Sequence, residues 1–296
     1  MPDVLWKLFR YNRHLLNDVS RLAAKPLLKF ARKKGILPGI FTALHTFGRN
    51  LFWNIHVHLS ITLDGLADDG KAWKSLYYVK KTLTPMWRYE IINLMRLAYK
   101  RGELELPREM KGTCTNLTEF NQWLEEQYQK NWIVHFARPS KNHHRNINYL
   151  GRYLKRPPVS MSRLKHYDGK MVSSEYLNHR TKQRDRVVCE GEEFLMRLLQ
   201  HVPDKGFRMI RYYGFLANRV RSKWLPKVYE LLDQPERKAI SIRFPSLLKY
   251  SFGIDPLKSI LCGSKMILTG IVPGKNRAQL LACHEKPAPG KKLVLQ

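Results

Sequence analysis

A chain of 296 residues, 44% of them hydrophobic, can bury a real core as one large domain or two small ones. Its 53 Lys and Arg against 24 Asp and Glu give a net charge of +29, which repels itself in the folded state unless the usual partner is a polyanion. No run of about 18 apolar residues is present, and the four cysteines form no Cys-x-x-Cys pair. We therefore expect neither a membrane span nor a disulfide framework, and a cytoplasmic setting is the simple expectation.

The amino-terminal quarter predicts a helix followed by two strands. Residues 5–34 keep near-helical spacing of apolar side chains, and Pro26 is expected to break or kink the helix. Residues 39–47 and 54–63 read as strands, and the short link between them predicts an antiparallel hairpin. Asp64-Gly65 and Asp68-Asp69-Gly70 mark the turn that follows.

Two histidines lie two residues apart on the second of these strands. Side chains at that spacing share a face, so His56 and His58 should point together while Ile55 and Val57 point the other way. A pair of imidazoles suits a divalent metal such as Mg²⁺ or Mn²⁺, although imidazole is a borderline ligand and does not choose between metals. The competing interpretation is a pair of histidines held by hydrogen bonds in a half-buried strand.

Further along the chain, two helices and a strand precede a basic loop. Thr84 and Pro85 resemble an N-cap and a first helical position, and the helix they open should close at Gly102. Apolar spacing predicts another helix over 117–128 and a strand over 131–137. The loop 138–145 then leads into a helix of about ten residues that Pro157-Pro158 stops.

That last helix carries Tyr149 and Tyr153, whose spacing of four puts both phenols on one face. A phenol is a reasonable nucleophile toward DNA phosphate, because the new phosphodiester keeps the energy of the cleaved bond. The competing interpretation is an ordinary tyrosine stripe on a helix. The surrounding cations favour the first interpretation, since they could grip phosphates on both sides of a cut. They are Arg138, Lys141, His143, His144, Arg145, Arg152, Lys155 and Arg156.

The rest of the chain continues the alternation of strands and helices. Residues 159–167 and 170–177 flank Asp168-Gly169, which predicts a hairpin. A helix over 192–202, a strand over 207–213 and a last helix over 222–233 follow, and the pattern weakens beyond about residue 235. The predicted class is α+β, an antiparallel sheet with helices packed on one side.

Four runs follow one another along the chain: Leu44–Gly48, Asn54–His58, Tyr149–Arg156 and Arg211–Arg219. Together and in this order they resemble the two-tyrosine HUH transposases of rolling-circle insertion sequences. The resemblance implies a ferredoxin-like sheet, metal binding by His56 and His58, and 5′-phosphotyrosine links from Tyr149 and Tyr153 to single-stranded DNA at element ends and targets. A third metal ligand is expected, with His45, His135 and Asn148 as candidates.

The resemblance also implies a division of labour along the chain. Residues 1–235 would form the catalytic domain, and 236–296 a carboxyl-terminal extension with a degenerate zinc-ribbon-like segment. The expected DNA contacts are Arg138, Lys141, Arg145, Arg152, Lys155, Arg156, Arg211 and Arg219.

The chain departs from the family pattern in two places. The zinc-binding segment with which family members usually begin is expected to be missing before Met1, and Ser259-Ile260-Leu261-Cys262-Gly263 has serine where relatives have the first cysteine of Cys-x-x-Cys-Gly. Zinc is therefore not expected in this chain. The alternatives that stay open are a truncated, catalytically idle DNA-binding protein and a replication initiator or relaxase with the same chemistry in a bacterial cytoplasm. Charge alone would also fit a ribosomal or membrane-surface protein.

Overall fold

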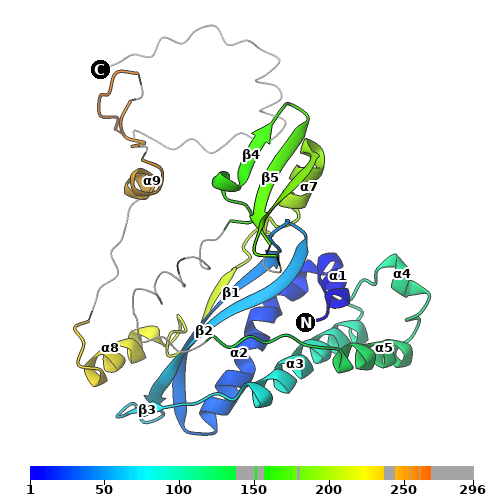
Figure 1. The fold of residues 1–296 in the computed structure, drawn as a ribbon. Helices are drawn as coiled ribbons and strands as arrows, with labels where there is room; N and C mark the ends of the chain where they lie inside the picture. Colours follow the sequence, from blue (N-terminus) through cyan, green and yellow to red (C-terminus); the bar gives the residue numbers. More distant parts are fainter. Residues whose placement is uncertain are drawn as a thin grey trace. The chain divides into compact units, whose positions relative to one another are not determined.

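The hairpin predicted from the sequence forms the centre of a four-stranded sheet. The computed structural model describes residues 1–137, 151, 157–178, 181–236, 244–253, 255–259 and 261–267. The strand order is β3-β2-β1-β7, and every neighbouring pair is antiparallel (Figure 1). The strands are β1 (Ile36–Phe47), β2 (Trp53–Ala67), β3 (Trp73–Ser75) and β7 (Ile210–Gly214).

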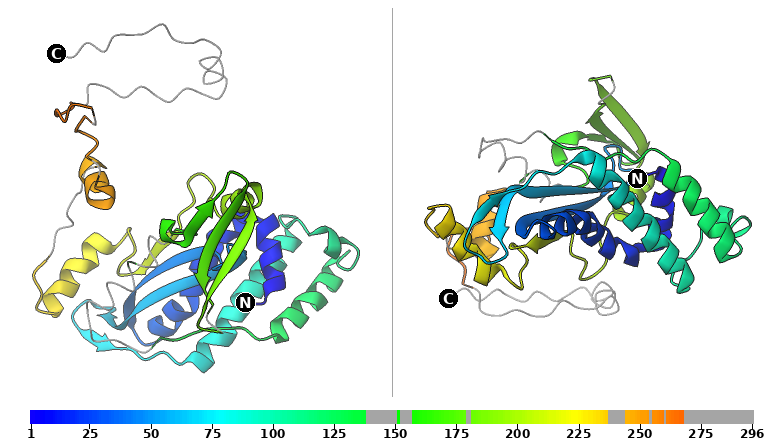
Figure 2. Two further views of the ribbon diagram at one scale, coloured as in Figure 1. Left: turned by 45° about the horizontal axis from the view of Figure 1, so that its top comes forward. Right: turned by 90° about the horizontal axis from the view of Figure 1, so that it is seen from below.

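Helices cover one face of this sheet, which confirms the predicted α+β arrangement (Figure 2). Alternate apolar residues of the two long strands, such as Ile40, Leu44 and Ile55, are buried against these helices and form the main core. None of the helices in the described parts of the chain is long and apolar enough to cross a membrane. The helices of this layer are α1 (Asp3–Tyr11), α2 (Leu16–Arg32), α3 (Lys80–Lys100), α4 (Arg108–Lys111) and α5 (Leu117–Gln129), with the 3-10 turn η1 (Arg13–Leu15).

A second, three-stranded sheet is attached to the tip of the hairpin. The predicted turn at Asp168-Gly169 is confirmed, because β4 and β5 pair across it. Leu51, in the link between β1 and β2, is buried against Cys189 and Phe194 of the second sheet and its helix. This lobe is built from η2 (Met161–Arg163), β4 (Leu164–Tyr167), β5 (Met171–Leu177), β6 (Arg184–Glu190) and α7 (Gly191–Leu199).

The first helical region breaks at Asn12, so of the break or kink expected at Pro26 the break is wrong. Pro26 lies inside α2. Asn12 ends α1 because its buried side-chain amide donates to the carbonyls of Leu8 and Glu105 at 2.8 Å and accepts from the Glu105 amide at 2.7 Å. A tertiary contact across more than ninety residues therefore decides where the chain turns.

The predicted start of α3 at Thr84 and Pro85 is also wrong. The helix begins at Lys80, and the Thr84 hydroxyl donates to the Lys80 carbonyl instead of capping. The extra turn buries Leu83 against α2 and β1, and that apolar burial outweighs the cost of a proline inside the helix.

The sequence predicts a turn at Asp64-Gly65, but both residues are part of β2. A Cβ at Gly65 would lie 2.5 Å from Cγ2 of Ile36 and 2.8 Å from the Leu37 carbonyl oxygen, so glycine permits close strand pairing there. The chain reverses at 68–70, where Gly70 has a φ of +70°.

Two more expectations near the helices are corrected. Residues 131–137 form no strand and pair with no described strand, because Trp132 alone is buried while Ile133 is 78% exposed. The helix predicted over 222–233 is α8 (Arg221–Leu231), but it is not the last, since α9 (Phe244–Phe252) follows. The chain divides into two compact units, Met1–Glu236 and Arg237–Gln296.

Candidate metal centre

Three histidines meet on the sheet face opposite the helices. His56 and His58 are two residues apart on β2, and His45 on β1 lies directly opposite His56 in the antiparallel register. Opposite residues of paired strands point to the same side of a sheet, so the three imidazoles share one face. The hairpin register therefore brings His45 beside His56, which lies eleven positions further along the chain, and so adds a third imidazole to the pair.

The geometry of the triad is compact. Ring centroids lie 5.4 Å apart for His45 and His56, 4.8 Å for His45 and His58, and 4.9 Å for His56 and His58. One ring nitrogen from each histidine can be chosen so that all three lie within 4.8 Å of one another. His45 is 3% exposed, and the other two are partly exposed, so the group is open on the side of β2.

The orientation of His56 favours metal binding. Its Nδ1 lies 3.0 Å from the Asn54 carbonyl oxygen. Because a carbonyl oxygen only accepts, Nδ1 carries the proton, and in the neutral ring Nε2 presents its lone pair. A backbone acceptor behind a ligating imidazole is the usual way of fixing its tautomer.

The donor set fits a divalent ion. Metal–imidazole bonds of about 2.1 Å require the nitrogens to lie within about 4.2 Å of one another, so small ring rotations suffice to close the site. Three neutral imidazoles leave the remaining coordination positions for oxygen ligands, as a catalytic metal needs.

An aromatic group supports the triad from the tip of the hairpin. Phe47 stacks on His45 with ring centroids 5.0 Å apart, and His201 contacts both Phe47 and Trp53. The His201 Nε2 donates to the Leu51 carbonyl oxygen at 2.9 Å, which leaves Nδ1 to accept from the Thr46 hydroxyl at 3.1 Å. Burial, together with nearby arginines, lowers the pKa of His201, which favours the neutral ring.

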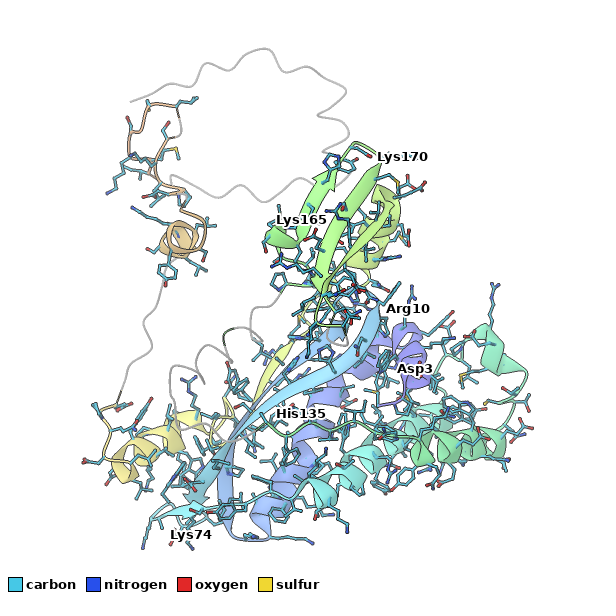
Figure 3. The ribbon with its side chains drawn as sticks, in the orientation of Figure 1. Asp3, Arg10, Lys74, His135, Lys165 and Lys170 are labelled. Atoms are coloured by element: carbon cyan, nitrogen blue, oxygen red, sulfur yellow. The ribbon has the colours of Figure 1, made fainter. Side chains whose placement is uncertain are left out.

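Of the three candidates for a third metal ligand, the described residues place His45 beside the histidine pair. His45 joins His56 and His58, whereas His135 is exposed and is not part of the group. His135, which is labelled in Figure 3, lies in the segment that follows α5. Asn148 lies outside the described residues, as do Tyr149, Tyr153 and six of the predicted DNA contacts, Arg138, Lys141, Arg145, Arg152, Lys155 and Arg156.

The two remaining predicted DNA contacts are described and lie in different places. Arg211 on β7 points to the helix side of the sheet, where its guanidinium donates to Asn17 Oδ1 of α2 at 2.9 Å. Arg219 is exposed in the turn before α8. Thus Arg211 is not on the histidine face, and its contact with DNA stays a prediction.

Two aromatic residues beside the triad had no role in the sequence analysis. Phe41 on β1 pairs with Tyr212 on β7 and with Ser60 on β2, so the three form a row on the histidine face, two residues along from His58. Tyr212 is 42% exposed. Strand alternation places Phe41 with His45, but the pairing with β7 requires the tertiary structure.

The carboxyl-terminal unit contains the serine-substituted run noted in the sequence. The Lys258–Lys265 bridge closes a small loop around it, and Cys262 is exposed there. Hydrogen bonds from Ser259 and Ser264 lower the pKa of Cys262 to about 7. This thiol is therefore more acidic than Cys114 and Cys189, whose pKa burial raises.

Comparison with known proteins places this geometry in context. A family model named Y2_Tnp and described as "Putative transposase" matches residues 39–223, which include all three histidines. The transposase for insertion sequence element IS801 of Pseudomonas savastanoi pv. phaseolicola is 40% identical over 279 residues, covering 93% of this chain and 67% of that protein. "Putative transposase y4qJ" of Sinorhizobium fredii (strain NBRC 101917 / NGR234) is 29% identical over 241 residues, covering 78% of this chain and 60% of that protein. No solved structure matches the chain.

Proposed function

Because the chain belongs to the Y2_Tnp transposase family, we propose that it cuts and rejoins single-stranded DNA at the ends of a rolling-circle insertion sequence. The observation that carries the proposal is the triad of His45, His56 and His58 on the sheet face opposite the helices. A Mg²⁺ or Mn²⁺ ion held by these imidazoles would polarise the scissile phosphodiester and offset the charge of the transition state. The triad would thus act on the reacting phosphate, and the tyrosines would carry out the covalent step.

Tyr149 and Tyr153 are proposed as the nucleophiles. The phenol oxygen bonds to phosphorus while the bond from phosphorus to the 3′ oxygen breaks, and the phenol proton passes to that oxygen or to water. The DNA 5′ end is then held as a phosphotyrosine. Attack by another 3′-hydroxyl reverses the step and rejoins strands without ATP, and a second tyrosine allows two strands to be held in succession.

The aromatic residues beside the triad support a single-stranded substrate. Phe41 and Tyr212 lie in one row beside the triad, and aromatic side chains stack on the unpaired bases of a single strand. The net charge of +29 supports binding of the phosphate backbone. Aromatic residues next to metal ligands would hold the bases that flank the cut, which orients the phosphate between the triad and a phenol.

The test is the formation of a covalent protein–DNA adduct. Single-stranded oligonucleotides that tile the DNA on both sides of the coding sequence, labelled at the 3′ end, are incubated with the full chain and Mn²⁺. A 5′-phosphotyrosine keeps the 3′ fragment, so a labelled adduct should survive denaturing electrophoresis. It should disappear with EDTA and in Tyr149→Phe/Tyr153→Phe.

Tyr167→Phe is the matched control, because Tyr167 is an exposed tyrosine on β4. It should form as much adduct as the parent chain. Equal adduct in the Tyr149→Phe/Tyr153→Phe variant would refute the proposed nucleophiles. Salt-dependent DNA binding with no adduct in any divalent metal would instead support a catalytically idle DNA-binding protein.

A further inference from the structure

A group of exposed cations lies at the end of the main sheet farthest from the hairpin tip. It is formed by two segments, 68–75, which includes β3, and 219–231, which includes α8; we call this the α8–β3 surface. Figure 3 labels Lys74 at this end of the sheet. Its cations, all exposed, are Lys71, Lys74, Arg219, Arg221, Lys223 and Lys227.

The two segments are in contact. A Cβ placed on Gly70 would lie 2.8 Å from Cζ3 of Trp224 and 3.6 Å from Cδ of Lys227, so α8 packs against the turn that precedes β3. The Lys223 ammonium lies 4.4 Å from the centroid of the Trp224 ring. Figures 1 and 2 show α8 next to the β3 end of the sheet. The cations of both segments therefore belong to one surface.

The charge of this surface is not neutralised within the described protein. None of its six cations forms an ion pair with a described residue. By contrast, Glu175 on the second sheet lies within 4.0 Å of Lys165, Arg184 and Arg186. The acidic residues of the two segments are Asp68, Asp69 and Glu230, which leaves an excess of three positive charges.

The distance between this surface and the triad follows from strand geometry. Lys74 on β3 pairs with Gly65 on β2, seven residues beyond His58. At about 3.3 Å per residue, the separation along β2 is about 23 Å. A stacked DNA strand rises about 3.4 Å per nucleotide, so roughly seven nucleotides span it.

We propose that the α8–β3 surface binds the phosphate backbone of single-stranded DNA about seven nucleotides from the phosphate held at the triad. Exposed lysines and arginines contact phosphates without reading bases, so this contact anchors the strand and carries no sequence preference. The distance rests on the proposed function, which puts the cut at His45, His56 and His58. The anchoring itself is a separate property that binding measurements detect without any cleavage.

The experiment compares the full chain with Arg221→Gln/Lys223→Gln/Lys227→Gln, using fluorescent oligo-dT of about 6 and about 24 nucleotides over a range of salt concentrations. The loss of three phosphate contacts should reduce the steepness with which log affinity for the long oligonucleotide falls with log salt concentration by about 2. At ~0.1 M salt, the affinity for this oligonucleotide should fall on the order of tenfold to a hundredfold. The short oligonucleotide cannot reach from the triad to this surface, so it should lose less affinity than the long one. Lys100→Gln/Arg101→Gln/Lys111→Gln, exposed cations at the ends of α3 and α4, is the charge-matched control and should bind like the parent.

Three results would overturn the proposal: an unchanged affinity for the long oligonucleotide, an equal loss for both lengths, or an equal loss in the control variant. A loss confined to duplex DNA of the same length would refute the assignment to single strands. Circular dichroism and a thermal midpoint check that each variant folds. Adduct formation, assayed separately, tests the proposed function, so an absent adduct with length-dependent binding would refute only the chemistry and the stated distance.

Discussion

Replacing the triad histidines should abolish stabilisation of the protein by a divalent metal. The three ring nitrogens lie within 4.8 Å of one another, so in the proposed site each histidine would supply one of three bonds to a single ion. We expect His56→Ala/His58→Ala, and separately His45→Gln, to lose metal binding. A ligand that binds only the folded protein raises stability by RT ln(1 + [L]/Kd), which makes metal binding visible as a shift in the unfolding temperature.

The size of the shift follows from that relation and the size of the folded unit. At a free Mn²⁺ concentration about 100 times Kd, the gain is about 2.7 kcal/mol. The unit that carries the triad spans Met1–Glu236, and in domains of this size 1 kcal/mol moves the thermal midpoint by about 2–4 °C. Mn²⁺ should therefore raise the midpoint of the parent chain by roughly 5–11 °C, and EDTA should reverse the gain.

The Mn²⁺-dependent shift is measured by thermal unfolding with and without Mn²⁺. Each variant is compared with its own metal-free midpoint, so destabilisation by the substitution itself cancels. The matched control is His135→Ala, because His135 is an exposed histidine outside the triad. It should keep the full shift. A Mn²⁺ shift that persists in His56→Ala/His58→Ala, or that is lost in His135→Ala, would refute the assignment of the metal to the triad.

Three further predictions follow from particular side chains. Burial lowers the pKa of His201 below 6.5, so the stability that depends on its neutral form is complete above about pH 6.5 and falls as the pH drops toward the folded pKa. The urea midpoint of the parent should therefore fall between about pH 7.5 and about pH 5.5, and His201→Gln should reduce this loss. An unchanged loss in the variant would contradict this role. Tyr212→Ser should weaken the binding of oligo-dT, measured by fluorescence anisotropy, by about 1–3 kcal/mol. The control Tyr89→Ser, at an exposed tyrosine on α3, should leave binding unchanged. Equal effects of the two substitutions would argue against base stacking. Asn12→Ala removes three hydrogen bonds from a residue that is 2% exposed, and it should lower the free energy of unfolding in urea by about 3 kcal/mol. Asn17→Ala, at an exposed position, should lower it by less than about 1 kcal/mol. Similar losses would mean that the Glu105 contact does not hold the break between α1 and α2.

The local pattern of residues along the chain was enough to predict many of the strands, helices and turns of this protein. Strand alternation placed His56 and His58 on one face, because side chains two apart on a strand always share a side. The hairpin of β1 and β2, the turn at Asp168-Gly169 and the helices α5, α7 and α8 follow from periodicity and turn residues that act within a few positions. The spacing of Tyr149 and Tyr153 is equally local, and their chemistry stays a prediction.

The tertiary structure decided what depends on residues far apart in the chain. The sequence did not distinguish the candidates for a third ligand, and the register of β1 against β2 places His45 beside His56 and His58. The break at Asn12 depends on the Glu105 backbone, and α3 begins early because Leu83 finds a place in the core. A single sequence shows which residues alternate along a strand, but it does not show which strand lies beside it or in what register, because pairing energies depend on the whole packed structure.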